Sequence, residues 1–206
     1  MKTGTASVLL LLFSTLLSGC VIGERRPTLY YPAKAEQSAI PAANAGAKAP
    51  AKPIQIVLRT FDDQRADKKV VGTTRNGFGM KMADVTPVNS VPDWVQMALR
   101  NELQDAGYDV VTDAKADDAA PNRAVVTGEI LNVYCDMYFN YTGQVSMVAR
   151  VNKAGKEVLN RHYSGEGSAG VAWAATEESY AQSLALALAA AIKPFIAELD
   201  KNLSSP

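Results

Sequence analysis

Cys20 is the residue with the clearest chemical use, because its thiol ends an apolar run of the kind found in secretory signal peptides. Lys2 charges the start of the chain, residues 8–17 are largely apolar, and two small residues stand directly before the cysteine. A transmembrane helix needs about 20 apolar residues, so this run is too short to span a bilayer. The sequence therefore predicts an exported chain from which residues 1–19 are removed as a signal peptide.

The ending Leu17-Ser18-Gly19-Cys20 resembles the lipobox of bacterial lipoproteins. This resemblance implies that a diacylglycerol is attached to the Cys20 thiol, and that Cys20 becomes the first residue of the mature chain. An ordinary signal peptide followed by a chance cysteine is the alternative. Residue 21 is Val rather than Asp. By similarity to enterobacterial sorting, this points to the outer membrane, with the domain facing the periplasm.

The remaining polar residues lack the spacing of a common catalytic or metal site. His162 is the only histidine, so a zinc site with two histidines is excluded. The sequence has no Gly-x-Ser-x-Gly, no phosphate-binding loop ending in Lys-Ser or Lys-Thr, and no His-Glu-x-x-His. No carboxylate stands at strand spacing from His162, which favours a surface residue over a general base. We therefore expect that the protein is not an enzyme and that it binds no metal and no cofactor other than the lipid on Cys20.

Two further features allow a structural and a functional interpretation. Asp62, Asp63 and Asp67 could offer oxygens to calcium, but their spacing is not that of an EF-hand and Arg65 lies among them. A turn held by aspartate contacts is the favoured interpretation. Cys135 has no partner for an internal disulfide once the other of the two cysteines carries lipid. A small buried side chain is favoured over a reactive thiol there.

Composition predicts one folded domain behind a polar linker. Lys plus Arg equals Asp plus Glu at 21 each, so no overall charge draws the chain to nucleic acid. Residues 20–53 form the lipidated N-terminus and a tether rich in Ala and Pro, about 33 residues that would span roughly 110 Å when extended. Tyr30 and Tyr31 break its polarity and either lie at the lipid interface or dock on the domain. The domain itself is predicted over residues 54–206.

In the first half of this domain, we predict strands over residues 54–61, 70–74, 78–85 and 108–111 and a helix over 92–106. Asn76-Gly77 between two strands is a strong signal for a two-residue hairpin turn, because both residues tolerate positive φ. The helix begins near Pro92, which suits a first turn, and ends before Gly107, a natural C-terminal cap.

In the second half, we predict strands over residues 124–134, 141–152 and 157–165 and a helix from about 181 to 203. The second of these strands alternates apolar and polar side chains, so one of its faces is buried. Ala154-Gly155 makes a turn, which gives an antiparallel meander. Pro194 interrupts the helical stripe, so we expect a kink or a restart near residue 193. The fold class is α+β, with a single mixed, largely antiparallel sheet and two helices packed on one face.

The best candidate for a binding surface is a cluster of aromatic and thioether side chains near the end of a predicted strand. Its members are Tyr134, Met137, Tyr138, Phe139 and Tyr141. Such residues are enriched in interface cores, but alternation along a strand would bury about half of them, so core packing is the alternative. Trp173 lies in the small-residue stretch 165–175. That stretch is either a mobile loop displaying an aromatic side chain or a place where a helix approaches the sheet closely.

Several short motifs carry a resemblance to a known family. Asp63-Gln64-Arg65-Ala66-Asp67 follows the first strand, and a helix with Leu99 and Leu103 ends in Gly107-Tyr108. With the lipobox and the Pro-rich spacer, this resembles the YajG-like family of bacterial lipoproteins over most of the mature domain. The resemblance implies an outer-membrane lipoprotein among small α+β envelope domains that serve transport or assembly machines. It implies no catalytic residues.

Two functional hypotheses follow. The first is an outer-membrane lipoprotein that binds envelope proteins as a non-catalytic accessory or assembly module, and self-association is compatible with it. The alternative is an auxiliary lipoprotein of an envelope lipid transporter, with a groove between helices and sheet that accepts acyl chains. A hydrolase is the weakest hypothesis. A filled core with an exposed aromatic patch would favour the first, and an apolar cavity would favour the alternative.

Overall fold

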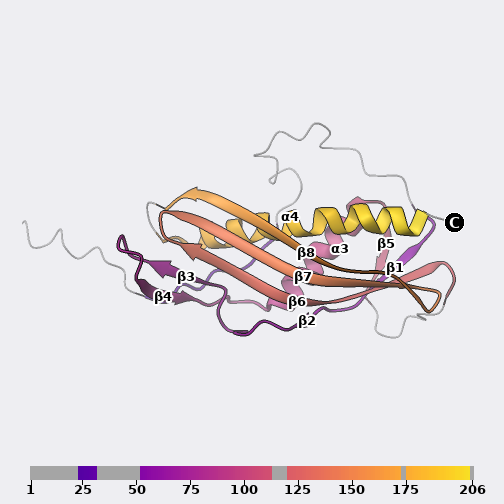
Figure 1. Ribbon diagram of the computed structural model, residues 1–206, viewed down its shortest axis with the longest axis horizontal. Helices are drawn as coiled ribbons and strands as arrows, with labels where there is room; N and C mark the ends of the chain where they lie inside the picture. Colours follow the sequence, from indigo (N-terminus) through magenta and orange to yellow (C-terminus); the bar gives the residue numbers. More distant parts are fainter. Residues whose placement is uncertain (1–22, 32–51, 113–119, 173–174, 205–206) are drawn as a thin grey trace, which may run out of the picture.

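The computed structural model describes residues 23–31, 52–112, 120–172 and 175–204, which form a curled, mixed sheet of eight strands and two helices (Figure 1). The predicted α+β fold is therefore confirmed. Two residues singled out in the sequence, Cys20 and Trp173, lie outside the described residues.

The sheet is built around β6 (Arg123–Met137), a strand of 15 residues. Three short strands follow one another along one of its edges, all parallel to it: β1 (Gln55–Leu58), β2 (Asp62–Asp63) and β3 (Gly72–Arg75). On the far side of β1 lies β5 (Asp109–Val111), also parallel. The predicted strand over residues 54–61 is thus central, because β1 lies between β5 and β6. The next strand, β2, also pairs with β6.

The other edge of β6 carries the antiparallel meander. β7 (Asn140–Lys153) pairs with β6, and β8 (Lys156–Val171) pairs with β7. Side chains alternate along β7 as the sequence predicted, and Val145, Met147 and Ala149 are buried on the inner face. The strands are longer than predicted, because β8 continues past Gly165 to Val171.

The helix α4 (Glu177–Ser204) covers the inner face of the meander at very short range (Figure 1). A Cβ atom at Gly143 would lie 2.5 Å from the Ser183 carbonyl oxygen, and one at Gly167 would lie 2.5 Å from the Ala187 nitrogen. Glycine is therefore required where the strands approach the helix backbone. Close helix packing is the correct interpretation of the described part of the small-residue stretch, and the loop interpretation is wrong up to Val171.

The apolar stripe of α4 faces the core, as predicted, and the helix runs without a break through Pro194. The expected restart near residue 193 is therefore wrong. Ala190, whose carbonyl loses its usual donor at Pro194, is exposed together with the proline, so water can satisfy that carbonyl. By length and hydropathy α4 could also cross a membrane, but burial in this core accounts for its apolar character.

The second helix, α3 (Val91–Asp105), begins and ends as the sequence predicted. The Ser90 hydroxyl accepts a hydrogen bond from the backbone nitrogen of Asp93 at 3.3 Å and caps the first turn. Gly107 follows the helix with a φ of 92°, a conformation that favours glycine. Trp94 and Leu99 bury the inner side of α3 in the same core as α4.

The hairpin of β3 and β4 (Lys81–Val85) is confirmed, but its turn differs from the prediction. The turn spans Asn76 to Met80, whose backbone groups hydrogen-bond at 3.0 Å. The positive φ falls on Gly79, at 81°, and not on Asn76 or Gly77. The Asn76 side chain explains the wider turn, because its oxygen accepts hydrogen bonds from the Phe78 and Met80 nitrogens.

Residues 23–31, which the sequence assigned to the tether, pack against the domain. Leu29 and Tyr31 are buried, and Asn89 exchanges two hydrogen bonds with the Leu29 backbone at 2.7 and 2.9 Å. The indole nitrogen of Trp94 donates to the Tyr30 carbonyl at 2.9 Å. Docking is therefore the correct choice for the two tyrosines. The folded unit includes residues before position 54, and residues 32–51 join two segments of that unit.

Candidate functional site

The structure divides the predicted aromatic cluster between the two faces of the sheet. Met137 and Tyr141 point inward and are buried. Tyr134 is half-buried on the outer face, and Tyr138 and Phe139 are exposed in the turn between β6 and β7. The core interpretation is thus correct for Met137 and Tyr141, which strand alternation turns inward, and the interface interpretation stays a prediction for the other three.

Tyr141 is fixed in the core by specific contacts. Its hydroxyl accepts a hydrogen bond from the Thr176 nitrogen at 2.8 Å, and its ring packs edge-on against Tyr180 at a centroid distance of 5.1 Å. The Tyr180 hydroxyl in turn lies 2.7 Å from that of Thr74. Burial raises the pKa of Tyr180 to about 12, so this hydroxyl stays neutral. These residues tie α4 to the sheet and are not available to a ligand.

The outward members of the cluster line a hollow on the face of the sheet that the helices leave uncovered. We call it the aromatic hollow. It has a volume of about 440 Å³ and is lined by Tyr134, Asp136, Tyr138, Phe139, Asn140, Thr142 and Gln144. Aromatic walls with amide and hydroxyl groups at the edge suit the binding of a side chain or a peptide segment. The lining holds no histidine or cysteine that could serve as a base or a nucleophile.

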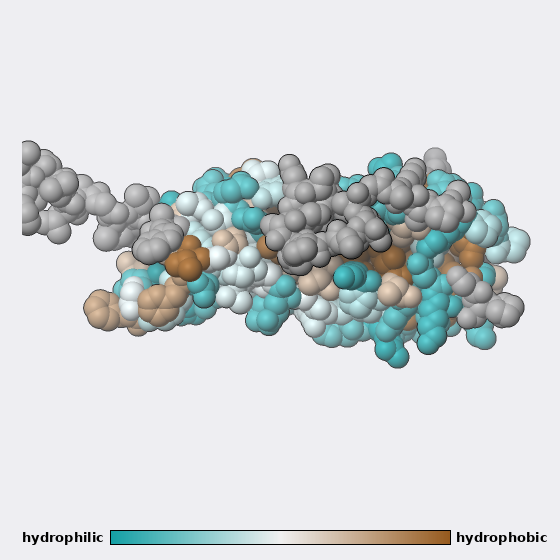
Figure 2. All heavy atoms as spheres, turned by 90° about the horizontal axis from the view of Figure 1, so that it is seen from above, coloured by the Kyte–Doolittle hydropathy of each residue, from teal (hydrophilic) through white to brown (hydrophobic). Residues whose placement is uncertain are grey.

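An exposed apolar surface adjoins this hollow at the end of the molecule. We call it the apolar tip. Its large apolar side chains and exposed fractions are Phe78 88%, Met80 58%, Tyr138 37%, Phe139 62% and Val171 62%. Figure 2 shows hydrophobic side chains, among hydrophilic ones, at the end where Figure 1 draws the β3–β4 turn and the β6–β7 turn, and further hydrophobic side chains toward the opposite end. Phe78, Met80 and Val171 were not predicted as members of a site. For Phe78 and Met80 the available signal was an apolar residue beside a predicted turn, and for Val171, the last residue of β8, the sequence offered none.

Specific contacts hold the two turns of the tip together. The Tyr138 hydroxyl donates to the Gly77 carbonyl at 3.1 Å, and its ring lies at a centroid distance of 4.0 Å from that of Phe139. Arg75 pairs with Asp136 at 2.8 Å and donates to the Gly79 carbonyl at 3.1 Å. The contacts of Tyr138 and of Arg75 with Asp136 fix the β3–β4 turn beside the β6–β7 turn, so the exposed side chains of both turns lie at the same end of the molecule.

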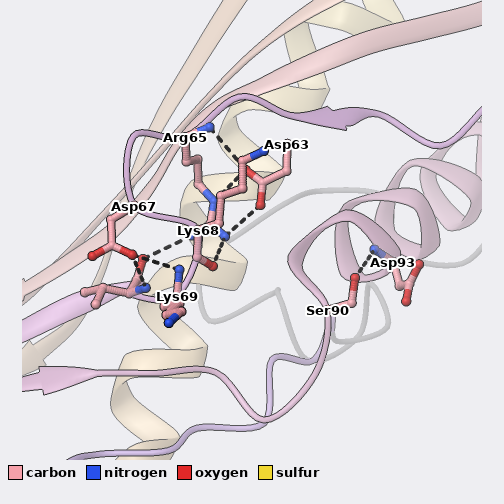
Figure 3. Close-up of polar contacts among 8 residues, drawn as sticks. Asp63, Arg65, Asp67, Lys68, Lys69, Ser90 and Asp93 are labelled. Atoms are coloured by element: carbon pink, nitrogen blue, oxygen red, sulfur yellow. Dashed lines mark hydrogen bonds and ion pairs between the residues drawn. The ribbon is translucent and has the colours of Figure 1, made fainter.

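The acidic cluster is a structural turn, as the favoured interpretation predicted (Figure 3). Arg65 is buried and binds both carboxylate oxygens of Asp63 at 2.9 Å, and it also donates to two backbone carbonyls of the turn. Asp67 accepts hydrogen bonds from the nitrogens of Lys69 and Val70. Burial alone would raise the pKa of Asp63, but the hydrogen bonds from Arg65 outweigh it and hold that pKa below its ordinary value.

The other chemically capable residues are placed apart. Cys135 is buried, and burial raises the pKa of its thiol to about 12, so a reactive thiolate is excluded at neutral pH. His162 is exposed on β8. Among the described residues, no three His, Cys, Asp or Glu side chains gather in a group that could hold a metal ion.

Comparison with known families identifies the class of this protein. Residues 41–199 match the family described as "uncharacterized lipoprotein". The match covers well over half of the chain, so the chain belongs to this lipoprotein family. Membership agrees with a protein that is anchored to a membrane of the cell envelope. No curated protein matches the sequence.

Solved structures resemble the fold at low sequence identity. Protein XCC0632 from Xanthomonas campestris is 11% identical, with a TM-score of 0.52, and the match covers 87% of this chain and 98% of that one. This likeness concerns the fold alone. Lipoprotein GNA1162 from Neisseria meningitidis is 14% identical with a TM-score of 0.37, and the match covers 72% of this chain and 99% of the other.

Proposed function

We propose that this chain is a lipid-anchored, non-catalytic envelope lipoprotein that binds a protein partner through the aromatic hollow. The observation that carries the proposal is that half-buried Tyr134 and exposed Tyr138 and Phe139 line one hollow on an uncovered sheet face. Tyrosine and phenylalanine at such a place supply contact area without losing much conformational freedom on binding. The partner is an envelope protein, and neither nucleic acid nor a cofactor takes part.

The finer assignments belong to the same proposal. The lipobox resemblance supports cleavage before Cys20 and lipid on its thiol, and Val21 supports sorting to the outer membrane with the domain in the periplasm. The YajG-like motifs support a role as an accessory or assembly factor. The tight contact of α4 with Gly143, Gly165 and Gly167 argues against an acyl-chain groove between that helix and the meander.

Photo-crosslinking in cells tests the partner-binding role. A crosslinking amino acid replaces Gln144, which lines the hollow, and a matched control replaces His162, which is exposed farther along the same sheet face. We expect a discrete protein adduct from position 144 only, and its loss when Tyr134→Ser is added. Equal adducts from both positions, or an adduct unaffected by Tyr134→Ser, would contradict the proposal.

A further inference from the structure

The first described residues of the chain lie along β4, the strand that follows the β3–β4 turn of the apolar tip. The Arg25 nitrogen donates to the Asp84 carbonyl at 3.3 Å, and the Thr86 nitrogen donates to the Arg25 carbonyl at 2.8 Å. These bonds form a parallel bridge between Arg25 and Val85. Going back from Arg25 to Gly23 therefore follows β4 back toward Met80. The described chain begins at the end of the molecule that carries the tip.

Only a short stretch of chain separates the proposed anchor at Cys20 from this point. Cys20 precedes Gly23 by three residues, which reach at most about 11 Å. The tether of roughly 110 Å expected from the sequence required residues 23–31 to be free. Leu29 and Tyr31 are instead buried, and Asn89 hydrogen-bonds the Leu29 backbone. A lipid on Cys20 would thus hold this end of the domain at the bilayer surface.

We infer that the apolar tip is a membrane-contacting surface, in which Phe78, Met80, Phe139 and Val171 enter the lipid interface of the bilayer that holds the Cys20 anchor. The inference rests on the lipid anchor of the proposed function. Exposed aromatic and aliphatic side chains partition into such an interface. Tyr138 joins the two turns of the tip, because its hydroxyl donates to the Gly77 carbonyl and its ring packs against Phe139.

This arrangement would also orient the aromatic hollow. The hollow adjoins the tip through Tyr138 and Phe139, so it would open close to the membrane surface. The opposite end of the meander, with the β7–β8 turn at Ala154-Gly155, would point away from the lipid (Figure 1). A partner bound at the hollow would then be held against the same leaflet.

Fluorescence quenching by lipid tests the orientation. The full-length lipidated protein is placed in vesicles of phosphatidylethanolamine and phosphatidylglycerol that contain acyl-chain-brominated lipid. A nitrobenzoxadiazole probe is attached at Phe78→Cys, and in the matched control at Lys156→Cys in the opposite turn. Cys135 is buried and does not compete for the label. We expect a blue shift and quenching of the Phe78→Cys probe only.

Each outcome of this experiment decides the inference. Equal emission from both positions would overturn it, even if the crosslink from position 144 is found, so the two proposals fail separately. Mass spectrometry that finds no lipid on Cys20 would overturn the anchor and the orientation together.

A Phe78→Cys probe that is already shielded in a lipid-free Cys20→Ser dimer would assign the tip to a second copy of the chain. We also expect the lipid-free Cys20→Ser chain to bind these vesicles weakly through the tip, and the double variant Phe78→Ser, Phe139→Ser to keep the fold and lose that binding.

Discussion

The two turns of the meander have the same length and opposite character. Tyr138-Phe139 joins β6 to β7, and Ala154-Gly155 joins β7 to β8. At the second turn, both residues adopt positive φ, 50° and 77°, and lysines flank the pair. At the first turn, neither residue has positive φ, and both expose large rings. Connecting two antiparallel strands therefore does not require aromatic residues in this protein.

The comparison separates residues that close a turn from residues whose side chains are exposed without helping to close it. In the Ala-Gly turn, Gly155 adopts the positive φ of a tight hairpin without the steric cost of a Cβ atom, and Ala154 adopts it as well. The Tyr-Phe turn leaves 62% of Phe139 exposed, which brings little stabilisation from burial. A surface of this kind, extended by Phe78 and Val171, is typical of a binding site.

The largest effect on stability is expected at Tyr141, the buried aromatic residue that follows the exposed pair Tyr138 and Phe139. Tyr141→Ala should lower the free energy of unfolding by about 3 to 5 kcal/mol, because it empties a packed site and leaves the Thr176 nitrogen without its acceptor. Phe139→Ser should change it by at most about 0.5 kcal/mol. Urea denaturation measures both. Similar losses for the two variants would show that Phe139 belongs to the core.

A backbone prediction compares two glycines in open turns. Gly155 and Gly77 both have no atom within 4 Å of an added Cβ, but only Gly155 has positive φ. Gly155→Ala should therefore destabilise the protein by about 1 to 2 kcal/mol. Gly77→Ala should be neutral or stabilising by up to about 1 kcal/mol. If thermal unfolding ranks the two variants the other way, the Asn76-Gly77 turn has the geometry that the sequence alone suggested.

Local patterns in the sequence predicted most of the fold, and long-range packing decided the rest. The period of apolar residues located α3 and α4, and alternation located β7. The positive φ at Gly79 could not be predicted, because it depends on the Asn76 side chain bonding to the turn. The docking of Leu29 and Tyr31 depends on partners some 60 residues away, such as Asn89, and no local pattern records it.

For the candidate site too, local patterns predicted one part, and long-range packing decided the other. Alternation predicted that about half of the cluster from Tyr134 to Tyr141 would be buried, and Met137 and Tyr141 are the buried members. The contribution of Phe78 and Val171 could not be predicted, because three segments meet at the tip only in the folded sheet. Gly72 lies against the Cys135 backbone, with no room for a Cβ atom, and this close approach of β3 to β6 brings the β3–β4 turn to the tip.

Exchanging the chemistry of the first turn should separate stability from binding. Replacing Tyr138-Phe139 with Asn-Gly introduces residues suited to a two-residue hairpin. It removes the hydrogen bond from Tyr138 to Gly77, which is worth about 1 kcal/mol. We expect a small change in the thermal midpoint and loss of both the Gln144 crosslink and lipid quenching. Retention of both signals would show that neither ring is needed for binding.

The smallest effect concerns acid, and it should not depend on either turn. The pKa of Asp63 is lowered below the ordinary value of 3.8 in the folded protein, so its contribution to stability is present above about pH 4. That contribution is lost as the pH falls through the folded value, because the unfolded chain then binds the proton more readily.

Asp63→Asn should flatten the fall of stability between about pH 5 and 3. The exposed neighbour variant Asp62→Asn controls for the loss of one charge, and the Asn-Gly turn variant should keep the wild-type acid profile. Urea denaturation at each pH measures these slopes. An unchanged slope in Asp63→Asn would mean that the pair with Arg65 fixes the turn without contributing to acid stability.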